Sequence, residues 1–180
     1  MPKFAHIADT HIRNLKYHTE YKEIFQQLYE KLREEKVDYI IHCGDIAHTK
    51  TQISPEFVDL CSDFFRNLAE IAPTYIILGN HDGNLRNFSR LDALSPIVEA
   101  LSIPTLHLIK KSSQIDLQTP YTLSALSIFD KDNWDLDLDE KRTNIALYHG
   151  AVKGAVTDVG YTIEHGDVDI DTLKQFDYVF

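Results

Sequence analysis

Apolar positions follow two patterns along the chain. In some segments they recur with the period of a helix, and in others they form short uninterrupted runs. From His18 to Lys36 the apolar positions follow the spacing of a helix with one buried face. Ser54 followed by Pro55 is typical of a helix start, and Pro73 ends this second helix. A third helix is expected over residues 88–101.

Short apolar runs predict the strands, and most of these runs follow or precede a predicted helix. The expected strands are Phe4–Ala8, Val37–Cys43, Thr74–Leu78, Ile103–Ile109, Thr143–Tyr148 and Phe176–Phe180. Residues 115–128 are expected to form two antiparallel strands with a turn at Thr119-Pro120, residues 130–140 a polar surface loop, and residues 151–171 an irregular segment. The alternation predicts an α/β fold with a parallel sheet and right-handed crossovers, in a single domain over residues 1–180.

Polar side chains follow four of the predicted strands at the point where each strand ends. The segments are Asp9-Thr10-His11, Gly44-Asp45 with His48 three residues on, Gly79-Asn80-His81-Asp82, and His149-Gly150. Ligands of open α/β sheets bind at the carboxyl ends of the strands, so these side chains are expected to converge on one site. A single one of these segments could equally be an ordinary turn, but four in order, each after an apolar strand, argue against that alternative.

The candidate ligands combine carboxylate and amide oxygens with imidazole and include no thiolate. This mixture suits manganese, iron or zinc better than a structural cysteine site. Asp9 and His11 are two residues apart on an extended segment and can face one ion, whereas Asp45 can bridge two ions and Asn80 offers a neutral oxygen. Two such cations can clamp a phosphate and lower the pKa of a bridging water.

The two residues after Asn80 are candidates for proton transfer rather than for metal binding. His81 could protonate the leaving oxygen of a phosphate ester. Asp82 could then orient the imidazole of His81. Both are therefore assigned as catalytic candidates.

Charge and composition narrow the possible functions. The chain has 180 residues, with 18 basic and 28 acidic side chains and a net charge of −10, which argues against a nucleic-acid binder with a broad basic face unless bound cations supply positive charge. Cys43 and Cys61 lack a zinc spacing and are expected to be reduced core residues. No signal peptide or membrane-length apolar run is evident, so we expect a cytoplasmic protein without a membrane partner.

The four segments Asp9-x-His11, Gly44-Asp45, Gly79-Asn80-His81-Asp82 and His149 resemble the first four blocks of the calcineurin-like metallophosphoesterases. The resemblance extends from Phe4 to Phe180. It implies a two-layer β-sandwich flanked by helices and a two-metal hydrolysis of phosphate esters. It further implies that Asp9 and His11 hold one metal, that Asp45 bridges, that Asn80 and His149 hold the second metal, and that His81 is the general acid.

Within that family, three segments are similar to the recombination and double-strand-break repair nucleases, the SbcD-like branch. They are HIADTHI at 6–12, HCGDIAHTKTQISPE at 42–56 and GNHDGNLR at 79–86. This branch implies manganese-dependent cleavage of DNA as an exonuclease or endonuclease, with His48 helping to place the DNA phosphate. It also implies a homodimer through the helices at 54–70 and 88–101 and an SMC-like coiled-coil ATPase (SbcC-type) as partner.

The end of the chain departs from the family pattern. The family closes its site with Gly-His-x-His after a strand, and the sequence ends at FDYVF within what resembles that strand. The segment IEHGD, with His165, does not match the pattern. We therefore expect the domain to be incomplete at its C-terminus and the chain alone to bind metal weakly and to be inactive.

Several residues and functions keep an alternative interpretation. Asn84, Arg86 and Arg90 could contact a DNA backbone or could form a solvated helix start. Trp134 could dock on a partner or pack down as a lid. The alternatives to a DNA nuclease are a phosphatase or phosphodiesterase acting on a protein or small nucleotide, and a catalytically incomplete phosphoesterase-like domain used as a binding module.

Overall fold

The computed structural model describes residues 2–87, 89–118 and 120–180 and divides into two compact units, Met1–Ile109 and Lys110–Phe180. Each unit contains its own four-stranded sheet. The expectation that residues 1–180 form a single domain stays a prediction.

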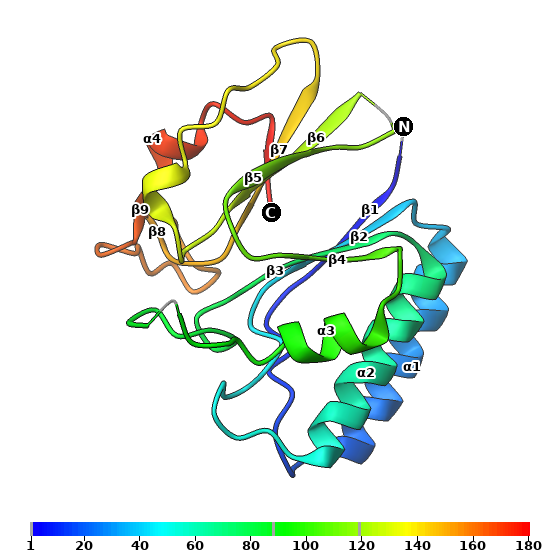
Figure 1. Cartoon of the computed structure of the whole chain (residues 1–180). Coiled ribbons are helices and arrows are strands. Elements are labelled where there is room, and N and C mark those ends of the chain that lie inside the picture. The colour runs from blue at the N-terminus through cyan, green and yellow to red at the C-terminus, as the bar shows by residue number, and fades with distance from the viewer. Residues whose placement is uncertain (1, 88, 119) are drawn as a thin grey trace. The chain divides into compact units, whose positions relative to one another are not determined.

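The first unit alternates strands and helices, and its strands form one parallel sheet in the order β1-β2-β3-β4 (Figure 1). Its elements are β1 (Phe4–Ile7), α1 (His18–Glu35), β2 (Tyr39–Cys43), α2 (Pro55–Ile71), β3 (Thr74–Ile77), α3 (Ser95–Leu101) and β4 (Leu106–Ile109). The α/β class and the parallel sheet predicted from the alternation are confirmed. The carboxyl ends of all four strands lie along the same edge of this sheet, because parallel strands run in one direction.

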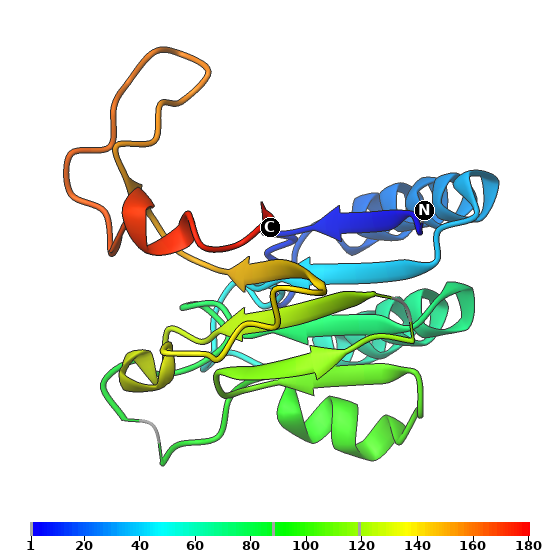
Figure 2. The ribbon, with the colours of Figure 1, turned by 90° about the horizontal axis from the view of Figure 1, so that it is seen from above.

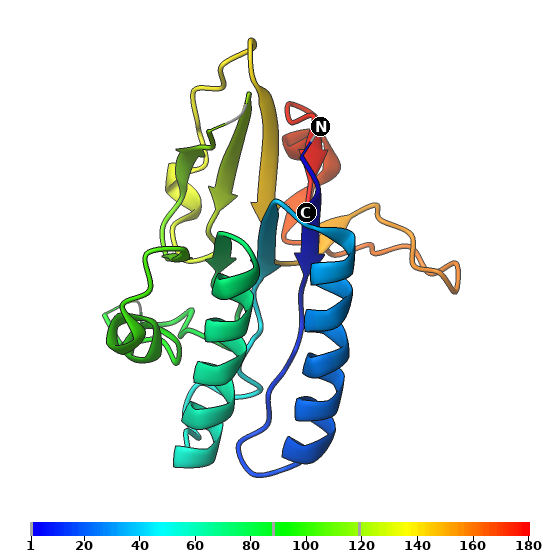
Figure 3. The ribbon, with the colours of Figure 1, turned by 90° about the vertical axis from the view of Figure 1, so that its right-hand side faces the viewer.

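The core of the first unit lies between the sheet and a pair of helices. Helices α1 and α2 lie side by side (Figure 3) and turn aromatic side chains toward each other. The ring of Phe64 on α2 is fully buried and stacks on Phe25 of α1, with 4.3 Å between ring centroids. The buried His42 ring on β2 lies edge-on to the same phenylalanine, with 6.1 Å between ring centroids, so His42 is part of the core.

The start of α2 follows the predicted capping pattern. The Ser54 hydroxyl oxygen accepts from the backbone N–H of Phe57 at 3.2 Å, and Pro55 occupies the first turn. The same hydroxyl donates to the carbonyl oxygen of Asn14 at 2.9 Å. One side chain thus fixes the helix start to the segment that follows β1.

The third helix is shorter than predicted, since α3 begins at Ser95 and the helix was expected over residues 88–101. Phe88 lies outside the described residues, and none of residues 89–94 is helical. The cause is Asp92, whose Oδ1 accepts from the backbone N–H groups of Leu94 and Ser95 at 2.9 and 2.6 Å. An aspartate that accepts from these first N–H groups starts a helix at this point and does not continue one.

The second unit contains a mixed sheet in the order β10-β7-β6-β5, in which only the β5–β6 pair is antiparallel (Figure 2). Its elements are β5 (Ser113–Asp116), β6 (Tyr121–Leu126), a 3-10 turn (Lys131–Asn133), β7 (Thr143–Tyr148), β8 (Val152–Lys153), β9 (Val168–Asp169), α4 (Ile170–Leu173) and β10 (Tyr178–Val179). The predicted antiparallel pair is confirmed, although Thr119 of its turn lies outside the described residues. The segment expected to be irregular contains the short parallel pair β8–β9.

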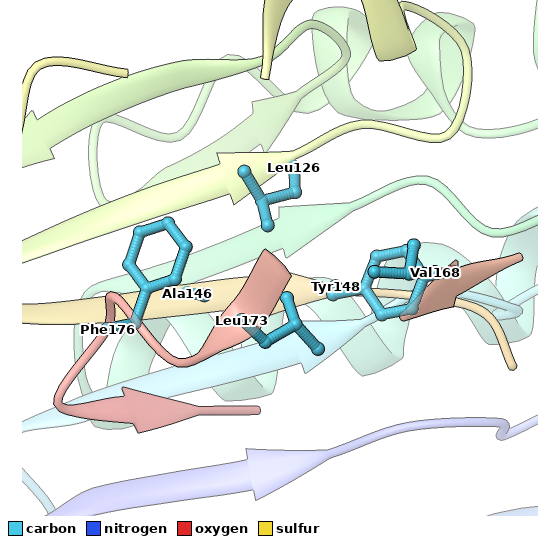
Figure 4. Packing of buried hydrophobic residues seen from close by; sticks show 6 residues of the cluster. All are labelled: Leu126, Ala146, Tyr148, Val168, Leu173 and Phe176. Carbon is cyan, nitrogen blue, oxygen red and sulfur yellow. The ribbon is translucent and has the colours of Figure 1, made fainter. Parts of the chain in front are cut away.

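A separate apolar cluster forms the core of the second unit (Figure 4). Its buried members are Leu126, Ala146, Tyr148, Val168, Leu173 and Phe176. Trp134 packs against this cluster, with its ring edge-on to Tyr148 at 5.5 Å and its indole N–H donating to the carbonyl of Ser127 at 2.8 Å. Trp134 therefore packs down on the second unit, and its expected role as a lid stays a prediction.

None of the helices in the described ranges is long and apolar enough to cross a membrane.

Replacing Phe64 tests the aromatic core of the first unit. We expect Phe64→Ala to lower the free energy of unfolding by about 3–5 kcal/mol, because it removes a fully buried ring and leaves a cavity. Val58→Ala, a partly exposed position on the same helix, is expected to change it by less than about 1 kcal/mol. Urea unfolding followed by circular dichroism measures both, and Phe64→Leu replaces Phe64→Ala if the latter does not fold. Similar losses at the two positions would contradict this account of the core.

Candidate metal centre

The segments that follow β1 and β2 are joined by backbone hydrogen bonds along their length. The N–H of Asp9 donates to the carbonyl of Gly44 at 3.1 Å, and that of His11 donates to the carbonyl of Asp45 at 2.9 Å. Two residues further, Ile12 forms an isolated parallel bridge with Ala47. The pairing of the two strands therefore continues past their ends and brings the candidate ligands of both segments together.

Three of the candidate ligands have a left-handed backbone. The φ angles of Asp9, His11 and Asp45 are 54°, 45° and 55°. This conformation is uncommon outside glycine, although aspartate and histidine tolerate it better than most residues. Strain of this kind persists only where the surrounding structure imposes it, and it occurs preferentially at functional sites.

The imidazole of His11 lies between two carboxylates. Its Nε2 is 3.5 Å from Oδ1 of Asp9 and 3.7 Å from Oδ2 of Asp45. Two ligand atoms that each lie about 2.0–2.2 Å from one ion can be at most about 4.4 Å apart, so both separations suit a shared divalent ion. The donor set of one imidazole and two carboxylates is also that of a transition-metal or manganese site.

His81 is held beside this group by two hydrogen bonds. Its backbone N–H donates to Oδ1 of Asp45 at 2.8 Å, and its Nδ1 lies 2.7 Å from the carbonyl oxygen of His48. Since a carbonyl oxygen only accepts, Nδ1 of His81 carries the proton and Nε2 is the atom left for chemistry. Ligand atoms of His11, Asp45 and His81 converge within 4.8 Å of one another, so a metal-ligand role for His81 is also compatible with the geometry.

His48 contributes its backbone to the site through the bond to His81, and its ring faces that of His81 at 6.1 Å. Burial lowers the pKa of His48, and Arg13 and the neighbouring His11 and His81 act in the same direction, which favours the neutral ring. The Nδ1 atoms of His11 and His48 are buried and find no hydrogen-bond partner among the described residues. Such orphaned polar atoms in one cluster fit a site that receives a polar ligand or an ion.

Asp82 does not orient the imidazole of His81, which corrects the role expected for it. Its Oδ2 accepts from the backbone N–H groups of Asp45 and Gly79 at 2.8 and 2.9 Å, and its Oδ1 accepts from that of Ala47 at 2.8 Å. The carboxylate is fully buried and is used entirely by the backbone of two strand ends. In the turn after β3, the side chain of Asp82 therefore points into the protein, whereas that of His81 is partly exposed.

The position of Asp82 has an electrostatic cost. Burial raises the pKa of its carboxyl to about 7 and the charge of Asp45 acts in the same direction, whereas the three N–H donors act against it.

The ends of β2 and β3 approach each other closely at Gly79. A Cβ atom on Gly79 would lie 2.1 Å from Oδ1 of Asp45 and 2.4 Å from its backbone nitrogen, so only glycine fits there.

Asn80 and His149, the predicted ligands of a second metal, belong to different units. Asn80 follows β3 in the first unit, and its carbonyl oxygen accepts from Nζ of Lys50 at 2.9 Å. His149 follows β7 in the second unit and is partly exposed. Their joint role at a second ion stays a prediction.

The predicted DNA contacts lie in the turns between β3 and α3. Oδ1 of Asn84 accepts from the backbone N–H of Arg86 at 3.0 Å, which closes a local turn. Arg86 and Arg90 are exposed. The segment is not a helix start, so that alternative interpretation is wrong, and the arginines are available at the surface of the first unit.

The family model of the calcineurin-like phosphoesterases matches residues 2–179. The chain belongs to this family. The resemblance stated from the four segments is thereby confirmed, and membership identifies a hydrolase of a family that uses divalent metals.

This phosphoesterase is similar to several known proteins. It is 40% identical over 188 residues to "Uncharacterized protein R555" of Acanthamoeba polyphaga mimivirus, covering 97% of this chain and 14% of that protein. It is 25% identical over 130 residues to "DNA double-strand break repair protein Mre11" of Archaeoglobus fulgidus, covering 60% of this chain and 29% of that protein. The chain thus spans less than a third of the length of either relative. Among solved structures, "Crystal structure of Pseudomonas putida nuclease MPE" matches with a TM-score of 0.46 and 19% identity, over 87% of this chain and 65% of that chain.

Two residues of the phosphoesterase site were missed from the sequence. Lys50 anchors the backbone of Asn80, and the Tyr21 hydroxyl donates to the carbonyl oxygen of His11 at 2.6 Å. Tyr21 appears in the sequence only as an apolar position of a helix. No local signal marks either contact, because both join segments that are distant in the chain.

Asp82→Asn tests the backbone role of Asp82. We expect it to lower the free energy of unfolding by about 2–3 kcal/mol, because the new amide N–H₂ faces a backbone donor in place of a carboxylate oxygen. Asp59→Asn, an exposed position on α2, is the matched control and is expected to change it by less than about 0.5 kcal/mol. Urea unfolding measures both variants. Equal stability of Asp82→Asn and the control would show that the three bonds do not hold the strand ends.

Proposed function

We propose that this chain provides the catalytic site of a DNA nuclease that hydrolyses phosphodiester bonds with two divalent ions, manganese being the preferred metal. The observation that carries the proposal is the position of His11 Nε2, 3.5 Å from Asp9 and 3.7 Å from Asp45. A group of this kind at the carboxyl edge of a parallel sheet suits an anionic substrate only when cations neutralise it.

In this proposal, Asp9, His11 and Asp45 hold one ion, and Asn80 and His149 hold the other with Asp45 shared between them. Bound divalent ions supply charge neutralisation of the phosphate and a water of lowered pKa. The chain fixes its ligands in advance through the paired segments after β1 and β2. Asp45 is further fixed, because its backbone N–H is bonded to Asp82 and its Oδ1 to the N–H of His81.

His81 is proposed as the general acid. Its Nδ1–H is engaged by the carbonyl of His48, so Nε2 is the atom that delivers a proton to the leaving oxygen and later recovers one from solvent. The neutral ring of His48 can donate or accept one hydrogen bond to a phosphate oxygen without adding charge. These roles keep the assignments made from the sequence, with Asp82 moved from catalysis to the support of the site.

DNA as the substrate is supported by the similarity to the archaeal relative named as a DNA double-strand break repair protein. Exposed Arg86 and Arg90 on the turns after β3 offer cations for a phosphate backbone. The net charge of −10 favours the alternative, a phosphodiesterase for small nucleotides. Comparing the cleavage of linear duplex DNA with that of a small cyclic nucleotide, both with Mn²⁺, separates the two.

Asp45→Asn tests the proposed metal site in the protein encoded by the whole reading frame that contains this chain. We expect Mn²⁺-dependent DNA cleavage to fall by at least about 100-fold, the upper end of what supporting residues of metal sites cost, because a neutral amide binds metal more weakly. Asparagine tolerates the left-handed backbone of Asp45, so the fold is retained. Asp59→Asn is the control, and near-normal cleavage by Asp45→Asn would refute the metal role.

His81→Ala is measured beside it and distinguishes two roles for the imidazole. A general acid predicts a loss of about 100-fold or more in rate with unchanged metal content, measured by mass spectrometry of the bound metal. Loss of one ion would instead identify His81 as a ligand, in keeping with its closeness to His11 and Asp45.

We also propose a homodimer through α2 and α3, the helices expected for this role. Exposed apolar side chains lie on or before these helices, with Val58 on α2 at 37%, Ile53 before α2 at 40% and Leu91 before α3 at 73%. Residues of both helices also line a cleft of about 350 Å³. We expect Val58→Asp to reduce the mass measured by sedimentation velocity from dimer to monomer, and Val159→Asp, at an equally apolar exposed position in the second unit, to leave it unchanged. A monomeric unmodified protein would contradict the proposal.

An SMC-like ATPase partner is also proposed for the whole protein, on the resemblance of three segments to the SbcD-like nucleases.

A further inference from the structure

A small cavity lies beside the candidate metal ligands on the first unit. It has a volume of about 240 Å³ and lies between the segment after β1 and the first two turns of α1, which run side by side (Figure 3). Its lining consists of Thr10, Tyr17, Glu20, Tyr21, Ile24 and Phe25. Sites that enclose a drug-sized ligand measure roughly 300–1,000 Å³, so this cavity suits a single planar ring system.

The walls of the cavity are aromatic and partly exposed. Among the lining residues Phe25 is buried, whereas Tyr17 and Ile24 are 57% and 58% exposed. Exposed tyrosine faces of this kind bind the bases of nucleic acids, because every base has a π-face on which an aromatic ring can stack.

The cavity is connected to the metal ligands through one side chain. Tyr21, which lines it, donates its hydroxyl proton to the carbonyl of His11 at 2.6 Å. Thr10, another lining residue, is the residue between Asp9 and His11. The cavity is therefore lined by a residue that is the sequence neighbour of two proposed metal ligands, Asp9 and His11.

A cation lies beside one wall of the cavity. The guanidinium of Arg13 lies 5.9 Å from the centre of the Tyr17 ring. The lining itself is largely apolar, with Glu20 as its one charged residue. The cavity therefore suits the flat face of a base, and Arg13 can contact a phosphate outside it.

We propose that this cavity binds a nucleobase of the substrate, stacked against Tyr17 and Tyr21, while Arg13 contacts a phosphate of the same strand. The inference rests on the proposed function, since it assigns part of the substrate to a place next to the proposed metal centre. Because stacking on an apolar wall grows with the area of the ring, it predicts a preference for purines over thymine. It also makes the helix α1 part of the substrate site.

The test measures binding of a nucleotide that the proposed reaction does not cleave. The probe is the 5′-monophosphate of 2-aminopurine deoxyriboside, whose fluorescence is quenched when the base stacks, titrated in the presence of Mn²⁺. We expect quenching in the unmodified protein and an affinity about tenfold lower in Tyr17→Ala, as stacking losses of this size predict. Deoxyribose 5-phosphate, which lacks the base, is expected to displace the probe equally from the unmodified protein and from Tyr17→Ala. Thymidine 5′-monophosphate is expected to displace the probe from the unmodified protein more weakly than deoxyadenosine 5′-monophosphate does.

Two matched variants separate stacking from a general disturbance of the segment. Tyr17→Phe keeps the ring and is expected to bind as the unmodified protein does. Leu15→Ala, at a side chain that is 66% exposed but outside the lining, is expected to have no effect. Absence of quenching, or equal affinity of Tyr17→Ala and Leu15→Ala, would overturn the proposal. Base-dependent binding without DNA cleavage would support the cavity and refute the nuclease, whereas cleavage without base-dependent binding would do the reverse.

Discussion

Asp82 joins the carboxyl ends of β2 and β3 through three backbone hydrogen bonds to one buried carboxylate. Parallel strands that end side by side leave their last N–H groups without the partners that a continued sheet would provide. Here a single side chain takes three of them, those of Asp45, Ala47 and Gly79. The turn that places Asp82 inward also places His81 outward, toward His11 and Asp45. The geometry of the candidate site depends on the opposite directions of these two neighbouring side chains.

The burial of Asp82 and the strain at the ligands are connected. Left-handed backbones at Asp9, His11 and Asp45 are unfavourable in isolation. They are maintained because the segment after β1 is bonded to the segment after β2, and the latter is bonded to Asp82. Glycine at position 79 allows the third strand to approach closely enough to complete this arrangement. These hydrogen bonds thus hold the side chains of Asp9, His11 and Asp45 on a backbone conformation that would be unfavourable without them.

Much of this could be predicted from the sequence, because the signals are local. The apolar runs at 4–8 and 74–78, the Ser54-Pro55 helix start, and the polar residues after the strands each follow from one short segment. The inward turn of Asp82 and the contact of Tyr21 with His11 could not be predicted, because they depend on which segments meet in space. The helix expected from residue 88 was placed too early for a similar reason, since the capping by Asp92 competes with an apolar pattern that continues through the turn.

The order of the strands has a consequence for how the protein folds. β1 pairs in parallel with β2, so that Phe4 lies opposite Tyr39, and every further pair in the first unit also spans a helix. Contacts of such long sequence separation form slowly, because the chain loses loop entropy before it gains them. The ligands on either side of α1 therefore meet only when this pairing is complete, and metal ions in the cell encounter a formed site only in chains that have passed the slow step. Bound metal would then mark folded molecules and shift the equilibrium further toward them.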